Sequence, residues 1–230
     1  MNSLEASDGR EHVGYVADLS CMEEVRRLGA EVRAEHPALD GLLNNAGSFD
    51  GNYTGQKVVT AEGNEYGLAV NVLAPFLLTS ILMPSLRASA KGARIVISSS
   101  VSMGAADALD DLQLEKSYSA HRAYSLSKLC DAMLSQELHT RYGDPPAMTF
   151  NCMDPTEEIG LGADTKMLRA GWGSWGTSAG EAKISAHMMD APEWAMRSGE
   201  GFQSSREVSN AARRKKLWED CVRLTGASWP

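Results

Sequence analysis

Ala93-Arg94-Ile95-Val96-Ile97-Ser98 is the stretch that decides the fold of this chain. It is apolar and rich in β-branched residues, which is typical of a strand buried on both faces of a sheet. Similar short runs occur at 41–44 and 148–153, and helical patterns lie between them. Strands that alternate with helices indicate a parallel sheet with helices on both sides. We therefore predict an α/β fold built on a doubly wound parallel sheet.

The expected elements around this strand alternate along the chain. A first strand is predicted at His12–Ala17, followed by a helix that Ser20 caps and that runs to about Ala34. Longer helices are predicted from about Ala61 to Ala88 and from about His121 to Tyr142. The chain shows neither internal repeats nor a long linker, so we expect residues 1–230 to form one domain.

The composition and net charge of the chain limit which kinds of partner it can bind. The 230 residues are 43% hydrophobic and 23% charged, an ordinary globular composition, and the net charge is −8. This negative charge argues against a nucleic-acid surface or a surface for anionic membranes. The longest apolar run, Leu68 to Leu82, is shorter than the ~20 residues that span a bilayer and contains Asn71 and Pro75. No transmembrane segment is therefore expected.

Cysteine usage indicates a reducing compartment. The cysteines are scattered, with neither a CxxC motif nor the spacing to histidine that is typical of a metal site. We therefore expect reduced thiols, a cytoplasmic location and no metal ion. The cysteines are Cys21, Cys130, Cys152 and Cys221.

Tyr124 and Lys128 provide the strongest indication of function. Four residues apart on a predicted helix, they lie on nearly the same face, one turn apart. An ammonium near a phenol favours the phenolate, which would lower the pKa of Tyr124 from its reference of about 10. Such a phenol could exchange protons with a carbonyl or an alcohol. Because Tyr-x-x-x-Lys pairs also occur by chance in many helices, the pair alone is weak evidence.

Two strand exits are expected beside this pair. The buried strand ends in Ser98-Ser99-Ser100, where a serine could donate a hydrogen bond to a substrate oxygen. At the neighbouring exit, Asn44-Asn45-Ala46-Gly47 offers small residues that let the backbone approach a flat ligand closely. The alternatives are a serine cap of the loop and a plain tight turn.

Asn71 is a polar residue inside an apolar helical pattern. Its neighbours are mostly apolar, so its amide needs a hydrogen-bond partner. Pro75, four residues later, has no N–H, so the Asn71 carbonyl loses its usual helical partner. The freed carbonyl could hold a water that passes protons towards Lys128. A kinked core helix with a solvated Asn71 is the alternative.

Together these motifs resemble the short-chain dehydrogenase/reductase family, and most closely its retinol-dehydrogenase-like branch. The separated motifs occur in the family's order, and the similarity extends over roughly residues 12–155. The resemblance implies a Rossmann-like fold, NAD or NADP as cofactor, and interconversion of a carbonyl and an alcohol on an apolar small molecule. It also allows a homodimer, which is common in the family.

The resemblance assigns roles to individual residues. Tyr124 would be the general acid/base, and Lys128 would tune its pKa and bind ribose. Ser100 would orient the carbonyl, and Asn71 would anchor the proton-relay water. The cofactor cleft would be formed by Asp18, as the adenine-binding acid, together with Asn45, Ala46, Gly47, Tyr124, Lys128 and Pro155.

The sequence departs from the family's pattern in two places. The family's opening strand, glycine-rich turn and helix are not found ahead of His12, so we expect a sheet without its first two strands. The family's Pro-Gly after the strand at Cys152 is replaced by Asp154-Pro155-Thr156. Residues 156–200 are expected to form a substrate-side lid and late helices. A G-x-G-x-x-G match at 171–176 follows no strand and is interpreted as part of this lid.

Two hypotheses follow from these observations. One is an NAD(P)-dependent oxidoreductase with Tyr124 as its acid/base. The other is a catalytically inactive remnant of the family that serves as an interaction or regulatory module, because the phosphate-binding turn is not found and the segment at Pro155 is altered.

Overall fold

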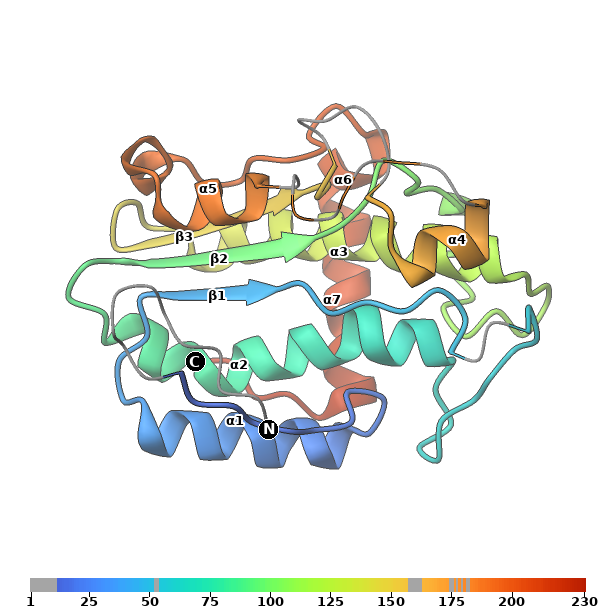
Figure 1. Ribbon diagram of the computed structural model, residues 1–230, viewed down its shortest axis with the longest axis horizontal. Coiled ribbons are helices and arrows are strands. Elements are labelled where there is room, and N and C mark those ends of the chain that lie inside the picture. The colour runs from blue at the N-terminus through green and yellow to red at the C-terminus, as the bar shows by residue number, and fades with distance from the viewer. Residues whose placement is uncertain are drawn as a thin grey trace.

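A computed structural model describes residues 12–51, 54–156, 163–173 and 183–230, together with 176, 178 and 180. Within these residues a parallel sheet has the strand order β1-β2-β3 (Figure 1). Its strands are β1 (Gly41–Asn44), β2 (Ala93–Ser98) and β3 (Met148–Met153), as the sequence predicts. The parallel register places the carboxyl ends of all three strands at one edge. The predicted α/β class is confirmed.

Alternating side chains of β2 point into two different cores. Ile95 and Ile97 belong to the main core, whereas Val96 packs with Met153 on the opposite face of the sheet. Because both faces are buried, β2 needs the continuous apolar run that its sequence provides. Figure 1 shows the helices on both sides of the sheet, so the doubly wound arrangement is confirmed.

The helices divide between the two faces. Those of the main core are α1 (Met22–Glu35), α2 (Ala74–Arg87), α3 (Ala120–Tyr142), α6 (Arg206–Ser209) and α7 (Ala211–Thr225). The other face is covered by α5 (Ile184–Asp190) and the 3-10 turn Pro192–Met196. A further 3-10 turn, Ala106–Ala108, precedes α3, and α4 (Lys166–Trp172) lies beyond β3.

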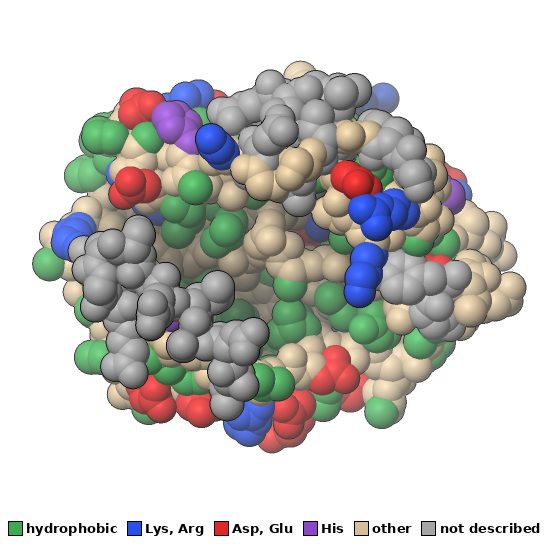
Figure 2. All heavy atoms as spheres, viewed as in Figure 1, with side chains coloured by type: hydrophobic (Ala, Val, Ile, Leu, Met, Phe, Trp, Pro, Cys, Tyr) green, Lys and Arg blue, Asp and Glu red, His purple; other side chains and the backbone are tan. Residues whose placement is uncertain are grey.

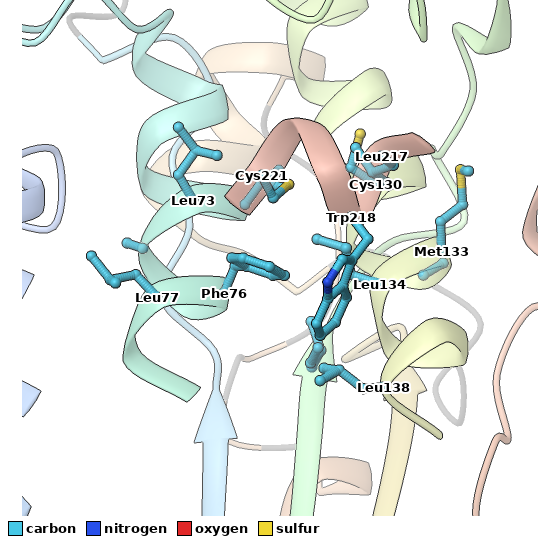
Figure 3. Packing of buried hydrophobic residues seen from close by; sticks show 14 of the residues in the cluster. Leu73, Phe76, Leu77, Cys130, Met133, Leu134, Leu138, Leu217, Trp218 and Cys221 are labelled. Atoms are coloured by element: carbon cyan, nitrogen blue, oxygen red, sulfur yellow. The ribbon is translucent and has the colours of Figure 1, made fainter. Parts of the chain in front are cut away.

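Aromatic and aliphatic side chains pack α3 against α2 and α7. Figure 3 shows Phe76 of α2 beside Trp218 of α7, and their ring centroids are 4.9 Å apart in an edge-on arrangement. Leu134 and Leu138 of α3 complete this packing. Each such buried side chain contributes about 1.5–3 kcal/mol to folding. This packing fixes the helix that carries Tyr124 and Lys128.

The helix predicted from Ala61 to Ala88 starts later and changes type. Residues 60–65 form a turn, and the helix then runs through a π-helical segment, η1 (Leu68–Leu73), into α2. The Ala74 N–H donates to the Ala69 carbonyl, five residues back. This hydrogen bond over five residues, in place of the four of an α-helix, lies just before Pro75, which has no N–H to donate. π-Helical segments of this kind are frequent at functional sites.

The same helix is long and apolar enough to cross a membrane. Among the described residues it is the one helix with this length and composition. It spans Leu68–Arg87, and 78% of its most apolar window is buried inside the protein. This burial is typical of a core helix.

The predicted strand at His12–Ala17 is wrong. In the described part of the chain no strand precedes β1, and the side chains of Val13 and Val16 are 57% and 78% exposed. The segment contacts α1 instead, where Arg27 Nη2 donates to the Val16 carbonyl at 2.6 Å. A strand needs a hydrogen-bonded neighbour, and the described sheet offers none to this segment.

The predicted Ser20 cap of α1 is also wrong. The Ser20 N–H and hydroxyl both donate to Asp18 Oδ1, at 2.9 and 2.7 Å. The first helical N–H, that of Met22, donates to the carboxylate of Glu62 at 3.0 and 3.1 Å. A negative charge stabilises a helix N-terminus, so a residue from a distant turn caps α1.

Candidate active site

The carboxyl end of β2 holds both residues of the Tyr-x-x-x-Lys motif. The Ser98 carbonyl accepts a hydrogen bond from Lys128 Nζ at 2.8 Å, and Ser99 Oγ donates to the Lys128 carbonyl at 2.6 Å. The Ser100 side chain lies close enough to the Tyr124 hydroxyl to lower its pKa. Ser98 and Ser99 therefore fasten α3 to the strand exit, and Ser100, the next residue, lies beside Tyr124.

Lys128 lies under the tyrosine ring, as its spacing predicts. Its Nζ is 5.8 Å from the centroid of the Tyr124 ring. The same atom is 2.9 Å from Oδ2 of Asp131, and both side chains are buried. We did not predict the role of Asp131, although its i, i+3 spacing from Lys128 in the sequence marks it as a neighbour on one helix face.

The pKa of Tyr124 is raised above its usual value, which contradicts the expected lowering. Burial is the largest cause, because it disfavours the charged phenolate. Lys128 lowers the pKa, as expected, and Ser100 lowers it as well, but Asp154 and Asp131 raise it further. The prediction considered the ammonium alone and neglected the burial of the ring.

Asn71 is buried at the predicted place, and its amide is fully engaged with protein atoms. Oδ1 accepts the Ser48 N–H at 2.7 Å, and Nδ2 donates to the Ser48 carbonyl at 2.9 Å. Nδ2 also donates to Ser127 Oγ at 2.9 Å. The side chain thereby joins the π-helical segment η1 to α3 and to the loop after β1.

The loop after β1 lies beside these residues. Asn45, Ala46 and Gly47 are exposed, so they are accessible to a ligand. A methyl group added at Gly47 would lie 3.8 Å from Lys128 Nζ and 3.7 Å from Asn71 Oδ1. Ser98 Oγ donates to Asn45 Oδ1 at 2.8 Å, which ties the exits of β1 and β2 together.

The other two residues that were predicted to bind the cofactor, Asp18 and Pro155, lie in two different parts of the molecule. Asp18 is engaged by Ser20 in front of α1, and none of its described hydrogen bonds reaches the Tyr124 cluster. Pro155 is half-buried in a turn directly after β3. The structure therefore places Pro155 at the same sheet edge as Ser100.

Asp154 connects the exits of β2 and β3. Its Oδ2 accepts the Val101 N–H at 2.6 Å, and its Oδ1 accepts the N–H and hydroxyl of Thr156 at 2.7 and 2.6 Å. This buried carboxylate was noted only as a departure from the family pattern. Residues 157–162, which follow this turn in the sequence, lie outside the described residues.

An aromatic cluster covers Tyr124, and sequence reasoning missed it. The ring centroids of Trp172 and Phe49 lie 5.2 and 5.9 Å from that of Tyr124. His121 Nε2 is 2.8 Å from the Gly171 carbonyl, and its ring packs against both Phe49 and Trp172. Helix α4 therefore lies over Tyr124. Ser174 and Trp175, within the glycine motif, lie outside the described residues.

The front of the molecule in Figure 2 is hollowed. The hollow lies between α4 and α5 on one side and α1 and α2 on the other, as Figure 1 locates them. Its lining is largely uncharged, and charged side chains lie at the rim in Figure 2. Strand β1 crosses this region in Figure 1, and its Leu43 is 37% exposed.

Comparisons with solved structures agree with this fold. A short chain dehydrogenase from Salmonella enterica is 22% identical with a TM-score of 0.62, and the match covers 84% of this chain and 74% of that one. A protein from Shigella flexneri, described as a short chain dehydrogenase complexed with NADP, is 22% identical with a TM-score of 0.61 over the same shares. At this identity the likeness shows the fold alone.

Sequence comparisons identify the family. A family model for short chain dehydrogenases matches residues 1–156. Human retinol dehydrogenase 14 is 30% identical over 88% of this chain, which spans 63% of that protein. Mouse polyprenol dehydrogenase is 30% identical over 99% of this chain and 72% of its own length. The chain belongs to the short-chain dehydrogenase/reductase family, in its retinol-dehydrogenase-like branch.

Proposed function

We propose that this chain carries the catalytic site of an NAD(P)-dependent oxidoreductase that interconverts a carbonyl and an alcohol on an apolar small molecule. The observation that carries the proposal is that Ser100 and the Lys128 ammonium both lower the pKa of Tyr124, with Lys128 Nζ 5.8 Å from the centroid of its ring. A phenol between a hydroxyl donor and an ammonium is suited to proton transfer at an oxygen atom. The raised pKa of Tyr124 keeps the phenol protonated at neutral pH.

The chain's residues perform three tasks in this proposal. Ser100 donates a hydrogen bond to the substrate oxygen and orients the carbonyl. Tyr124 donates its proton to that oxygen as negative charge develops there, and takes the proton back in the reverse direction. Lys128 stabilises the resulting phenolate through its charge. The Asn71 carbonyl remains the proposed site of the relay water, whereas its amide fixes the surrounding loop.

The residues beside the site fit part of a nicotinamide cofactor. The exposed Asn45, Ala46 and Gly47 next to Lys128 Nζ suit a flat ring and a ribose. NAD(P), when bound, supplies or accepts the hydride. Among the described residues no glycine-rich turn leads from a strand into a helix, so we assign no ligand to the pyrophosphate. Pro155 would border the nicotinamide end.

The covering of the site indicates an apolar substrate. Phe49, Trp172 and Met167 pack around Tyr124 and present hydrocarbon and ring surfaces to it. The names of the related retinol and polyprenol dehydrogenases also denote apolar alcohols. We propose that α4 is part of a substrate-side lid formed within residues 156–200. A cytoplasmic location, a homodimer and a single domain over residues 1–230 complete the proposal.

The function is tested with the Tyr124→Phe variant. Reduction of retinal by the wild type is followed through NADPH absorbance, with NADH in parallel. We expect the substitution to lower kcat by about 10²–10⁴-fold, the usual contribution of a positioned proton donor. NADPH binding, measured by cofactor fluorescence, should change little, because the backbone and Lys128 remain.

Two outcomes would count against this function. Equal turnover by Tyr124→Phe and the wild type would refute the acid/base assignment. Failure of the wild type to bind either cofactor at millimolar concentration would favour the inactive interaction module instead.

A further inference from the structure

Helix α3 places a third ionisable residue against the Tyr124–Lys128 pair. Asp131 lies three residues after Lys128, and its Oδ2 is 2.9 Å from Lys128 Nζ. The side chains of Lys128 and Asp131 are only 5% and 2% exposed. The second acceptor for Nζ is the Ser98 carbonyl at 2.8 Å. The ammonium is therefore held between a strand exit and a buried carboxylate.

The groups that face Asp131 come from three elements. Tyr124, Lys128 and Cys130 share its helix, Cys152 comes from β3, and Cys221 comes from α7. Burial raises the pKa of all three thiols, so they stay neutral near pH 7. The charge that opposes Asp131 is that of Lys128.

The summed charge of the Tyr124, Lys128 and Asp131 side chains decides how easily this cluster releases a proton. With Asp131 ionised, Lys128 protonated and Tyr124 neutral, the three side chains sum to zero. Loss of a proton from either Tyr124 or Lys128 leaves one uncompensated negative charge in a dry site, which is unfavourable. Without the carboxylate the pair starts at +1 and becomes neutral on losing a proton, so release becomes easier. This holds whichever group the proton leaves.

We propose that Asp131 is a positioning residue that aims the Lys128 ammonium and keeps the proton on the Tyr124–Lys128 pair at neutral pH. At neutral pH the free site is then in the form that carbonyl reduction requires, with Tyr124 protonated, whereas alcohol oxidation starts from the phenolate and is displaced to higher pH. This inference rests on the proposed function for its kinetic consequence only. The proton affinity itself is a property of the folded chain without cofactor or substrate.

The test is a titration of the chain with ¹³Cζ-tyrosine and ¹³Cε-lysine labels, read by NMR. Tyr124→Phe and Lys128→Met identify the two resonances. In Asp131→Asn the first proton release of the pair should move down by about one pH unit or more, which means about tenfold more deprotonated pair at pH 7. Asp131→Glu keeps the charge and should titrate as the wild type does.

Glu137→Gln is the matched control. Glu137 lies on the same helix with its side chain 7% exposed, but it pairs with Arg141 and Arg214 instead of Lys128. The control should leave the titration of the pair unchanged. In the kinetic arm, Asp131→Asn should move the pH profile of kcat/KM for alcohol oxidation down by about one pH unit, in line with the shift in proton release.

The result that overturns the proposal is an unchanged or raised titration of the pair in Asp131→Asn. Should this variant fail to fold, the wild type still decides. A ¹³Cγ-aspartate label follows the protonation of Asp131, and the Lys128 ¹³Cε resonance must move with the same midpoint because the two side chains are 2.9 Å apart. A Lys128 resonance that stays fixed while the Asp131 resonance titrates refutes the contact. If the titration shifts but no turnover is found, the positioning role stands and the enzymatic function fails.

Discussion

Asn71→Ala is the substitution that most directly tests how the site is held together. The Asn71 amide makes three hydrogen bonds, two to the backbone of Ser48 and one to Ser127 Oγ, at 2.7–2.9 Å. These bonds are the link between the π-helical segment η1, the loop that contains Gly47, and α3. Alanine removes all three and leaves the Ser48 N–H without its acceptor.

The expected loss can be estimated from these contacts. Each hydrogen bond contributes about 1 kcal/mol net, so the free energy of unfolding should fall by about 3 kcal/mol. With a urea m-value of about 3 kcal/mol/M, the midpoint of unfolding should move down by about 1 M. Because the Gly47 loop loses its anchor, NADPH affinity should fall as well.

Urea unfolding followed by circular dichroism measures the loss. Asn44→Ala is the matched control, because Asn44 is half-buried and its amide makes a single bond, to Thr79 Oγ1 at 3.1 Å. The control should lose about 1 kcal/mol. If Asn71→Ala costs no more than Asn44→Ala, the three contacts do not hold the loop, and the reasoning fails.

Two further predictions concern charged groups. Burial raises the pKa of Asp131 from 3.8 to about 6, so the native state holds this proton at pH values where the unfolded state has released it. The contribution of this proton to the free energy of unfolding is therefore fully present below pH 3.8 and is lost as the pH rises through 6. Asp131→Asn should therefore gain stability relative to the wild type between pH 4 and 7 in urea unfolding, and a constant difference would contradict this. Glu62→Ala should lower the free energy of unfolding by about 1 kcal/mol through loss of the α1 cap, as measured by urea unfolding. Glu23→Ala, exposed in the first turn of the same helix, is its control, and an equal loss would show that no specific cap exists.

The sequence predicted those parts of the fold whose local pattern and tertiary environment agree. Strands β2 and β3 are buried on both faces, and the apolar, β-branched run of β2 is typical of the interior of a sheet. Helix α3 begins at a serine cap and ends at a glycine, and both signals are local. These features follow from residues that are adjacent in the chain.

The failures depend on residues far apart in the chain. His12–Ala17 has a strand-like pattern, but the pattern does not reveal whether a neighbouring strand is available. The cap of α1 comes from Glu62, 40 residues away from Met22. Likewise, Phe49 from the loop after β1 and Trp172 from α4 meet over Tyr124, and nothing in their spacing predicts this contact.

The error on Tyr124 is the most informative, because the motif was predicted correctly and its pKa was not. Spacing places Lys128 one turn from the ring, and its charge acts in the expected direction. The same packing that brings the ammonium close also excludes water, and exclusion of water penalises the phenolate. Asp131 then offsets part of the ammonium's charge. A site arranged in this way holds its proton at neutral pH. In the proposed function, bound cofactor and substrate must therefore supply the remaining stabilisation when Tyr124 acts as a base, whereas proton donation in the reductive direction can begin from the resting state.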